Sequence, residues 1–138
     1  MKQNYTLNQL PEIAKEIIAT ASSKVLLFNG EMGVGKTTLI KELVKQLGIK
    51  DIASSPTFSL VNEYRTNDGK KVYHFDFYRI ESEEEVYDIG IEDYFYDDHW
   101  CFIEWGEKVK NLLPLKIVNI NIVATTDNQR TIEIDQDE

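Results

Sequence analysis

A glycine-rich stretch, Gly30–Thr37, limits what this chain can fold into more than any other part of the sequence. It matches the pattern G-x-x-x-x-G-K-[ST] at every fixed position. The apolar run Val25–Phe28 before it is typical of a strand that is covered on both faces. The segment Thr38–Leu47 after it has the apolar spacing of a helix, and Gly48 is a stop signal. The sequence therefore predicts a loop that joins a buried strand to a helix.

The residue types of this stretch suit phosphate binding. Glycines let the backbone fold closely round an anion, so that several N–H groups converge on it. We expect the Lys36 ammonium to contact the β- and γ-phosphates and the Thr37 hydroxyl to ligate Mg²⁺. The positive end of the following helix adds to this attraction. The pattern arises by chance in about 0.5% of chains of this length, so we expect a site for a magnesium-bound nucleoside triphosphate.

Such a site needs an acidic residue at the end of a strand, to hold Mg²⁺ or to orient the attacking water. Two apolar strands end in acids: Asp76 follows Tyr73-His74-Phe75, and Glu104 follows Phe102-Ile103. An acid among aromatic residues is costly unless it is paired, and a bound Mg²⁺ is one such partner. The alternative for each acid is a carboxylate that faces solvent or pairs with Arg79 or Lys108.

The remaining acids and the histidines are weaker candidates for chemistry. The acidic run Glu81–Glu85 and the pair Asp97-Asp98 are more simply explained as solvated surfaces. His74 alternates with apolar residues, which favours a hydrogen-bonded structural histidine. His99 is the only other histidine, so a histidine-based metal site is excluded.

The pattern along the whole chain predicts an α/β fold with a buried sheet and two added antiparallel hairpins, in a single domain over residues 1–138. A capping box at Thr6 begins a first helix, and a second at Ser82 begins a short acidic helix that ends near Gly90. Alternating apolar residues and turn signals predict the strands. The expected strands, besides the one before the loop, are Phe58–Arg65, Lys71–Tyr78, Trp100–Trp105, Ile117–Val123 and Thr131–Ile134.

Composition excludes several functional classes. The chain has 15 basic and 24 acidic residues and a net charge of −9, which argues against unassisted binding to RNA, DNA or anionic membranes. Cys101 is the only cysteine and lies in an apolar run, so we expect it to be buried and we expect no disulfide or cysteine-based metal site. With no signal peptide or membrane-length apolar run, we expect a cytoplasmic protein. At 138 residues, a second substrate pocket is expected on a partner.

Five segments in this order and spacing resemble the TsaE (YjeE) ATPases of bacterial tRNA threonylcarbamoyladenosine synthesis. The resemblance covers most of the chain and is carried by Gly30–Thr38, Ser55–Val61, Tyr73–Arg79, Gly90–Phe95 and Ile103–Trp105. It implies a P-loop NTPase-type fold with a mixed sheet flanked by helices. It also implies ATP and Mg²⁺ as ligands and weak ATP hydrolysis. The implied partners are TsaB and TsaD, which together transfer threonylcarbamoyl to the adenosine beside the tRNA anticodon. The chain itself would reach tRNA only through them.

The resemblance also assigns roles to residues. It makes Gly33, Val34, Gly35, Lys36, Thr37 and Thr38 the phosphate cradle, with Thr37 on Mg²⁺. Glu104 becomes an acid that holds Mg²⁺ or orients water, and Asp76 the acid of the second strand. Thr57, in a switch-like loop, would sense the γ-phosphate. Thr6 and Arg130 fall where the family places further nucleotide contacts, and Trp105 matches the family's tryptophan beside the acid.

Three other functions share this loop. A small-molecule or nucleoside kinase needs arginines in a lid, whereas this chain has only Arg65, Arg79 and Arg130, none in a lid-like insertion. A GTPase needs an Asn-Lys-x-Asp segment, which is absent. In a non-hydrolytic module, nucleotide only orders the loop Ser55–Phe58 for docking. The point that separates this module from a slow ATPase is whether a Glu104→Gln variant traps ATP without changing the affinity for it.

Overall fold

The computed structural model describes residues 2–49, 60–66, 69–96, 98–126 and 128–136. Seven strands and six helices or 3-10 turns alternate along this part of the chain. The strands are β1 (Lys2–Tyr5), β2 (Val25–Asn29), β3 (Val61–Arg65), β4 (Lys71–Asp76), β5 (Trp100–Glu104), β6 (Val118–Ala124) and β7 (Arg130–Asp135). The helical segments are η1 (Leu7–Gln9), α1 (Leu10–Thr20), α2 (Lys36–Gln46), α3 (Glu83–Asp88), α4 (Ile91–Tyr96) and η2 (Gly106–Leu112).

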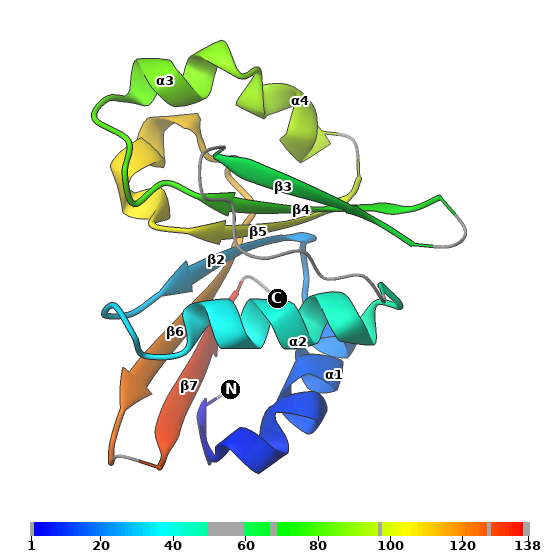
Figure 1. The fold of residues 1–138 in the computed structure, drawn as a ribbon, viewed down its shortest axis with the longest axis vertical. Coiled ribbons are helices and arrows are strands. Elements are labelled where there is room, and N and C mark those ends of the chain that lie inside the picture. The colour runs from blue at the N-terminus through cyan, green and yellow to red at the C-terminus, as the bar shows by residue number, and fades with distance from the viewer. Residues whose placement is uncertain (1, 50–59, 67–68, 97, 127, 137–138) are drawn as a thin grey trace.

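All seven strands form one mixed sheet in the order β1-β7-β6-β2-β5-β4-β3 (Figure 1). Strand β2 is central and runs parallel to both β5 and β6, and β4 runs parallel to β5. The hairpins β3–β4 and β6–β7 are antiparallel, and β1 adds to β7 in the antiparallel sense. The mixed α/β sheet with two antiparallel hairpins is therefore confirmed.

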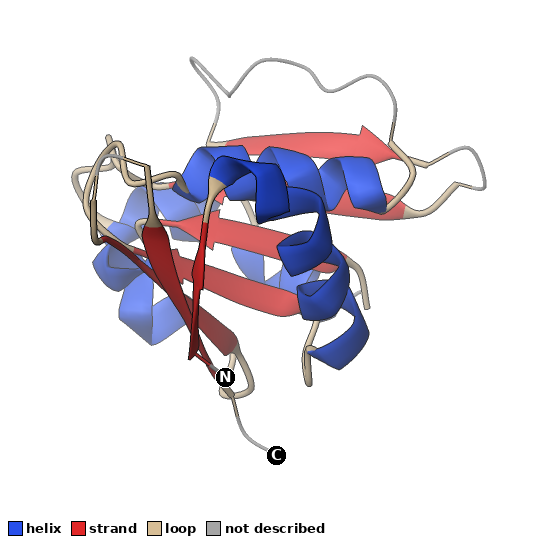
Figure 2. Ribbon diagram, turned by 90° about the horizontal axis from the view of Figure 1, so that it is seen from below, coloured by secondary structure: helices blue, strands red, loops and turns tan. Residues whose placement is uncertain are grey.

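Helices cover both faces of the sheet. Helices α1 and α2 pack on one face, while α3, α4 and η2 pack on the other (Figures 1 and 2). Because side chains alternate along a strand, Leu26 and Phe28 of β2 contact the first group and Val25 and Leu27 the second. This two-sided burial explains the continuous apolar run before the glycine-rich stretch. Cys101 is fully buried, as predicted.

Several element boundaries differ from the predicted ones. Helix α2 begins at Lys36, two residues before the predicted start, and ends at Gln46. Strand β4 ends at Asp76 instead of Tyr78, because the Asp76 carboxylate accepts the Tyr78 N–H at 3.0 Å and turns the chain. Strand β5 ends at Glu104, because Trp105 adopts a left-handed conformation with φ of 61°. The predicted start at Phe58 lies outside the described residues, and β3 begins at Val61.

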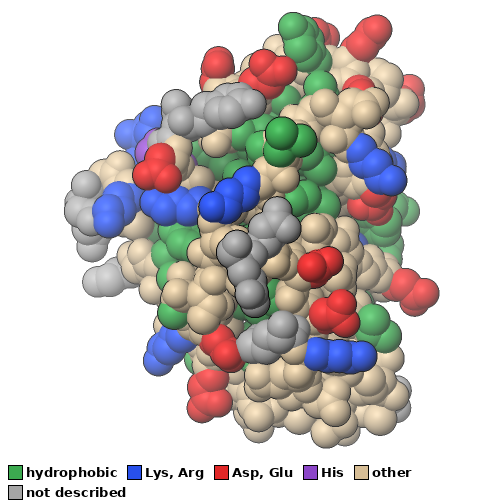
Figure 3. Space-filling model, turned by 180° about the vertical axis from the view of Figure 1, so that it is seen from behind, with side chains coloured by type: hydrophobic (Ala, Val, Ile, Leu, Met, Phe, Trp, Pro, Cys, Tyr) green, Lys and Arg blue, Asp and Glu red, His purple; other side chains and the backbone are tan. Residues whose placement is uncertain are grey.

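Several acidic side chains lie on the surface near α3. Most of the carboxylates of Glu81–Glu85 are exposed, as predicted for a solvated face. In the view of Figure 3, acidic side chains line the end of the molecule where α3 and α4 lie in Figure 1. Within the described ranges, no helix has the length and apolar character that a membrane crossing requires.

Candidate functional site

The glycine-rich stretch forms the connection between the end of β2 and the start of α2. Gly33 and Gly35 adopt φ values of 81° and 112°, which glycine adopts at far lower cost than other residues. Gly35 is the N-cap residue of α2. Gly35 therefore leaves the first turn of α2 without a side-chain cap, in the geometry that binds phosphate at helix N-termini.

The Lys36 side chain is buried at this loop, with a relative exposure of 5%. Its ammonium donates a hydrogen bond to the Gly30 carbonyl at 2.7 Å and lies 3.8 Å from the centre of the Trp105 ring. Both partners are neutral, and among the described residues no carboxylate lies within ion-pair distance of Lys36. A buried positive charge with neutral partners is suited to an incoming phosphate.

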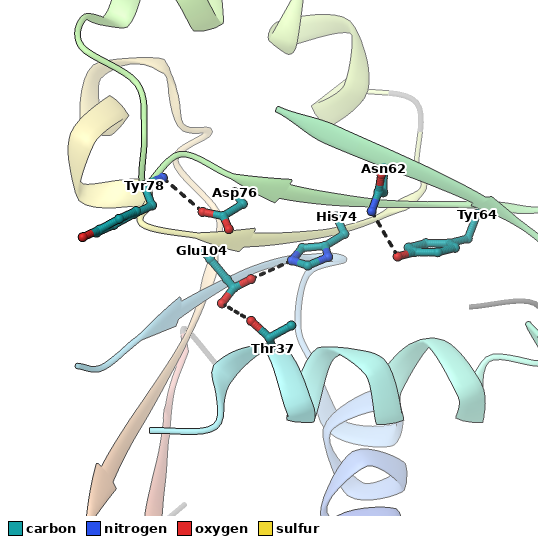
Figure 4. Close-up of polar contacts among 7 residues, drawn as sticks. All are labelled: Thr37, Asn62, Tyr64, His74, Asp76, Tyr78 and Glu104. Atoms are coloured by element: carbon teal, nitrogen blue, oxygen red, sulfur yellow. Dashed lines mark hydrogen bonds and ion pairs between the residues drawn. The ribbon is translucent and has the colours of Figure 1, made fainter. Parts of the chain in front are cut away.

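Glu104 is the acid that the fold places against the glycine-rich stretch. Its carboxylate is 3% exposed and is bound at both oxygens (Figure 4). The Thr37 hydroxyl donates to Oε1 at 2.8 Å, and Nε2 of His74 lies 2.8 Å from Oε2. Burial acts to raise the pKa of Glu104, but His74, Thr37 and the charge of Lys36 outweigh it and bring the pKa below its ordinary value. The carboxylate is therefore ionised at neutral pH.

Parallel strand pairing explains why Glu104 meets Thr37. In the β2–β5 pair, Phe28 is opposite Glu104, so β5 ends beside the point where β2 enters the glycine-rich stretch. Helix α2 starts from that stretch and lies on the face to which Phe28 and Phe102 point. Since side chains two residues apart share a face, Glu104 points to the same side as Phe102 and reaches the first turn of α2.

Asp76 lies beside Glu104 but makes a different contact. The two residues are opposite each other in the β4–β5 pair. The Asp76 carboxylate accepts the Tyr78 N–H, and Figure 4 shows no link from it to Glu104 or Thr37. Across the described residues, neither acid pairs with Arg79 or Lys108, and the Lys108 ammonium instead contacts the Tyr78 carbonyl. The role of Asp76 as a metal-linked acid stays a prediction.

His74 is buried, with 2% exposure, and hydrogen-bonded, as predicted. Sequence reasoning did not identify its partner, which is Glu104. The signal was present in the strand pattern. His74 is two residues before Asp76, and parallel alignment of the two strand ends brings it to the same face as Glu104.

A pocket of about 520 Å³ lies on the other side of the glycine-rich stretch. Thr6 and Arg130 both line it, as do Gly33, Val34, Gly35 and Thr38 of the predicted cradle. Thr6 and Arg130 meet because β1 pairs with β7 and places Tyr5 opposite Arg130. The first and last strands therefore lie side by side (Figure 2).

Arg130 and Tyr5 form part of the wall of this pocket. The Arg130 guanidinium donates from Nε to the Val34 carbonyl at 2.8 Å, and therefore ties β7 to the glycine-rich stretch. Burial raises the pKa of the Tyr5 phenol, and the positive charge of Arg130 only partly opposes this shift. The phenol therefore stays protonated at neutral pH and keeps its hydrogen-bond donor.

Sequence analysis did not identify five further residues that line this pocket: Tyr5, Leu7, Asn8, Leu10 and Asn128. No local pattern marked them, because the pocket depends on the pairing of the first strand with the last. Thr57, the predicted γ-phosphate sensor, lies outside the described residues.

Thr37 and Glu104 supply the donor atoms that Mg²⁺ prefers. A hydroxyl and a carboxylate are hard oxygen ligands, and Mg²⁺ is commonly held by one or two protein oxygens together with phosphates and water. The described part of the chain contains no group of three or more His, Cys, Asp or Glu side chains arranged to hold a metal alone. The residues present therefore fit a magnesium ion that arrives with a phosphate ligand.

Comparisons with known proteins agree on one family. The family model for "Threonylcarbamoyl adenosine biosynthesis protein TsaE" matches residues 5–132. The TsaE protein of Haemophilus influenzae is 41% identical over 115 residues, which are 83% of this chain and 72% of that protein. The TsaE protein of Bacillus subtilis is 38% identical over 138 aligned residues, covering 96% of this chain and 85% of that protein.

A solved structure supports the same assignment. The crystal structure of Bacillus subtilis YdiB matches with a TM-score of 0.76 and 32% identity, covering 96% of this chain and 82% of that one. The family model and the curated relatives each span most of the chain, including both strand ends that carry Glu104 and His74. This chain belongs to the TsaE family of threonylcarbamoyl adenosine biosynthesis proteins.

Proposed function

We propose that this chain is a P-loop NTPase-type subunit that binds Mg-ATP and hydrolyses it slowly. In this proposal, ATP binding and hydrolysis reset the TsaB–TsaD complex, which transfers threonylcarbamoyl to the tRNA adenosine beside the anticodon. The observation that carries the proposal is the 2.8 Å contact between Thr37, in the first turn of α2, and the buried carboxylate of Glu104. This contact joins a hydroxyl and an acid at the start of an uncapped helix, as magnesium and phosphate binding require.

The phosphates would bind at the glycine-rich stretch. Lys36 would exchange the Gly30 carbonyl and the Trp105 ring for β- and γ-phosphate oxygens, which are stronger partners for a buried ammonium. Thr37 and Glu104 would hold Mg²⁺, with Asp76 near enough in the sheet to act through water. The ion would neutralise charge that develops on the phosphates during transfer. Glu104, ionised at neutral pH, would orient the attacking water, and Thr57 would sense the γ-phosphate.

The nucleoside would occupy the pocket beside the phosphate loop. A volume of about 520 Å³ lies within the usual range for small-molecule sites. Its lining combines apolar side chains such as Leu7 and Leu10 with polar groups from Thr6 and Arg130. Such a lining suits a flat base attached to a polar sugar.

Charge and size favour a partner for the transfer step. The net charge of −9 disfavours direct binding of the tRNA backbone by this chain. The pocket beside the phosphate loop is filled by the nucleoside in this proposal, so threonylcarbamoyl and the target adenosine are assigned to TsaB–TsaD.

The test is ATP turnover by the purified protein, alone and with TsaB, TsaD and tRNA. Wild type is compared with Glu104→Gln and with Glu107→Gln, which removes an exposed carboxylate three residues away. We expect slow turnover that the partners stimulate. Glu104→Gln should lower it by about 100-fold, the usual scale for loss of a general base. Glu107→Gln should match wild type.

Two results would contradict the proposal. Tight ATP binding with no turnover under any condition would favour the non-hydrolytic module. A phosphorylated product formed from a nucleoside would favour a kinase. Two of the three arginines do not favour a kinase, because Arg65 lies 3.5 Å from Glu63 at the sheet edge and Arg130 is bound to the Val34 carbonyl.

A further inference from the structure

The carboxylate of Glu104 is held at both oxygens by side chains from two different elements. Thr37, at the start of α2, donates to Oε1, and His74, in β4, contacts Oε2, each at 2.8 Å (Figure 4). Both Glu104 and His74 are less than 4% exposed. A fully buried pair of this kind leaves the carboxylate little rotational freedom.

From this geometry we propose that His74 is a positioning residue for Glu104, which keeps the carboxylate aimed at the start of α2 while nucleotide is bound. The inference rests on the proposed function. When Thr37 turns its hydroxyl towards Mg²⁺, its hydrogen bond to Glu104 is released or shared. His74 is then the described side chain that still holds the carboxylate in place.

The strands give His74 a rigid base for this role. His74 lies inside β4 and Glu104 ends β5, and the two strands pair in parallel, with His74 opposite Phe102 and Asp76 opposite Glu104. An ionised carboxylate carries no hydrogen, so the contact requires the His74 proton on Nε2. His74 therefore donates to Glu104 Oε2, and the sheet sets the direction of that hydrogen bond.

Asp76 does not substitute for His74. It lies on the same face of β4, two residues further on, and its carboxylate is an acceptor that already binds the Tyr78 N–H at 3.0 Å. A second carboxylate beside Glu104 repels it instead of holding it. Position 74, two residues before the end of β4, thus needs a hydrogen-bond donor. Histidine supplies one with a side chain that fits the buried face.

Four variants separate the hydrogen bond from the packing. His74→Gln keeps an N–H donor near the place of Nε2, whereas His74→Asn carries the same amide on a side chain too short to reach Glu104. His74→Leu keeps bulk without a donor. His99→Leu is the matched control, because His99 packs against Tyr73 just before β5 begins, at the opposite end of that strand from Glu104.

Two quantities are measured for each variant. One is kcat and KM for ATP hydrolysis, and the other is the Mg²⁺ concentration needed for half-maximal binding of the non-hydrolysable analogue adenylyl imidodiphosphate, by calorimetry. Loss of a residue that orients a ligand typically lowers metal affinity or activity by about 10–100-fold. We expect His74→Leu and His74→Asn to lower kcat by about that factor with KM nearly unchanged, and to raise the Mg²⁺ requirement. His74→Gln should recover most of both losses, and His99→Leu should match wild type.

The outcomes are decisive in both directions. If folded His74→Leu retains the kcat and Mg²⁺ requirement of wild type, the inference is wrong. It is also wrong if His74→Gln loses as much as His74→Asn, because the donor would then not matter. If His74→Leu does not fold, the comparison of His74→Gln with His74→Asn still shows whether the hydrogen-bond donor matters. If wild type neither hydrolyses ATP nor binds the analogue with Mg²⁺, the proposed function fails and the inference fails with it. If wild type is active but the His74 variants behave like wild type, only the inference fails.

Discussion

Three polar or charged side chains of the described residues are buried, and all three lie at the same end of the sheet: Lys36, His74 and Glu104. Burying such groups is costly unless each has a partner. Glu104 is bound by Thr37 and His74, and Lys36 by the Gly30 carbonyl and the Trp105 ring. A group of satisfied but buried polar side chains beside a glycine-rich loop is more consistent with a ligand site than with core packing alone.

The first prediction concerns the pH dependence of stability. The pKa of Glu104 is lower in the folded protein than its ordinary value of about 4.5. Its ionised form therefore stabilises the fold at pH values above 4.5, and this contribution is lost as the pH falls through the lower, folded value. At pH 7, Glu104→Gln should reduce the free energy of unfolding by about 1–3 kcal/mol.

Urea denaturation at a series of pH values checks this prediction. The difference between wild type and Glu104→Gln should shrink as the pH falls below 4.5, because Glu104 of the unfolded chain then binds a proton that the folded chain takes up only at a lower pH. The exposed control Glu107→Gln should show no such trend. A Glu104→Gln difference that stays constant from pH 7 to pH 3 contradicts the account.

The second prediction concerns Lys36 and Trp105. The Lys36 ammonium lies 3.8 Å from the centre of the Trp105 ring. Phosphate binding should draw it away and change the emission of Trp105. A Trp100→Phe variant leaves Trp105 as the only tryptophan and should respond to Mg-ATP, whereas Trp105→Phe should not. An unchanged Trp105 signal, with ATP binding verified by calorimetry, would mean that Lys36 does not move.

At the scale of elements, the glycine-rich stretch depends on how closely it approaches β6. A Cβ at Gly30 would lie 2.7 Å from the Ile122 carbonyl oxygen and 2.8 Å from a Val34 methyl group. A Cβ at Gly33 would meet nothing within 4 Å. Gly30 is therefore required by contact with the neighbouring strand.

The third prediction follows from that difference. Because the Ile122 oxygen belongs to the backbone of β6, Gly30→Ala must shift the loop or the strand. Overpacking of this kind typically costs about 1–3 kcal/mol. Gly30→Ala should lose that much more stability than Gly33→Ala in thermal or urea denaturation. Equal losses of stability in Gly30→Ala and Gly33→Ala would contradict the close contact between Gly30 and the Ile122 carbonyl of β6.

Local sequence patterns predicted most elements, and long-range pairing determined the rest. The buried strand β2, the helix α2 and both hairpins have periodicities that a short window shows. Strand β1 was missed because Lys2–Asn4 is polar and lacks an apolar alternation, and only the pairing of β1 with β7 makes it a strand. The 3-10 segment η2 was missed as well, because it lacks a helical apolar period and Val109 interrupts its helical geometry.

The same division applies to the site. Glu104 was predictable because it ends an apolar strand, and the structure places it on Thr37. Thr6 and Arg130 came from the family resemblance, and the structure places both on the pocket. The Tyr5 wall of the pocket could not be predicted, since it depends on the pairing of the first strand with the last. The His74–Glu104 contact was not identified because it requires the parallel alignment of two strands, which the sequence indicates only through their acidic ends.

At the scale of the whole molecule, charge and architecture suggest a division of labour. One mixed sheet positions the glycine-rich stretch, an acid and a pocket at the ends of its strands, as ligand sites in α/β sheets commonly are. The chain as a whole carries a net charge of −9. In the proposed function, this chain supplies nucleotide-driven change to its partners, and the partners contact the tRNA.

The fourth prediction tests most directly the proposal that ATP binding by this chain resets the TsaB–TsaD complex. The measurement is the number of rounds of tRNA threonylcarbamoylation that limiting TsaB–TsaD completes with this chain present. Lys36→Ala removes the buried ammonium, and Lys41→Ala removes an exposed lysine of the same helix as a control. Losing a charged phosphate contact should weaken ATP binding by about 10–100-fold. Wild type and Lys41→Ala should support many rounds, and folded Lys36→Ala should stop near the first. Repeated rounds with Lys36→Ala at the wild-type rate would contradict the account.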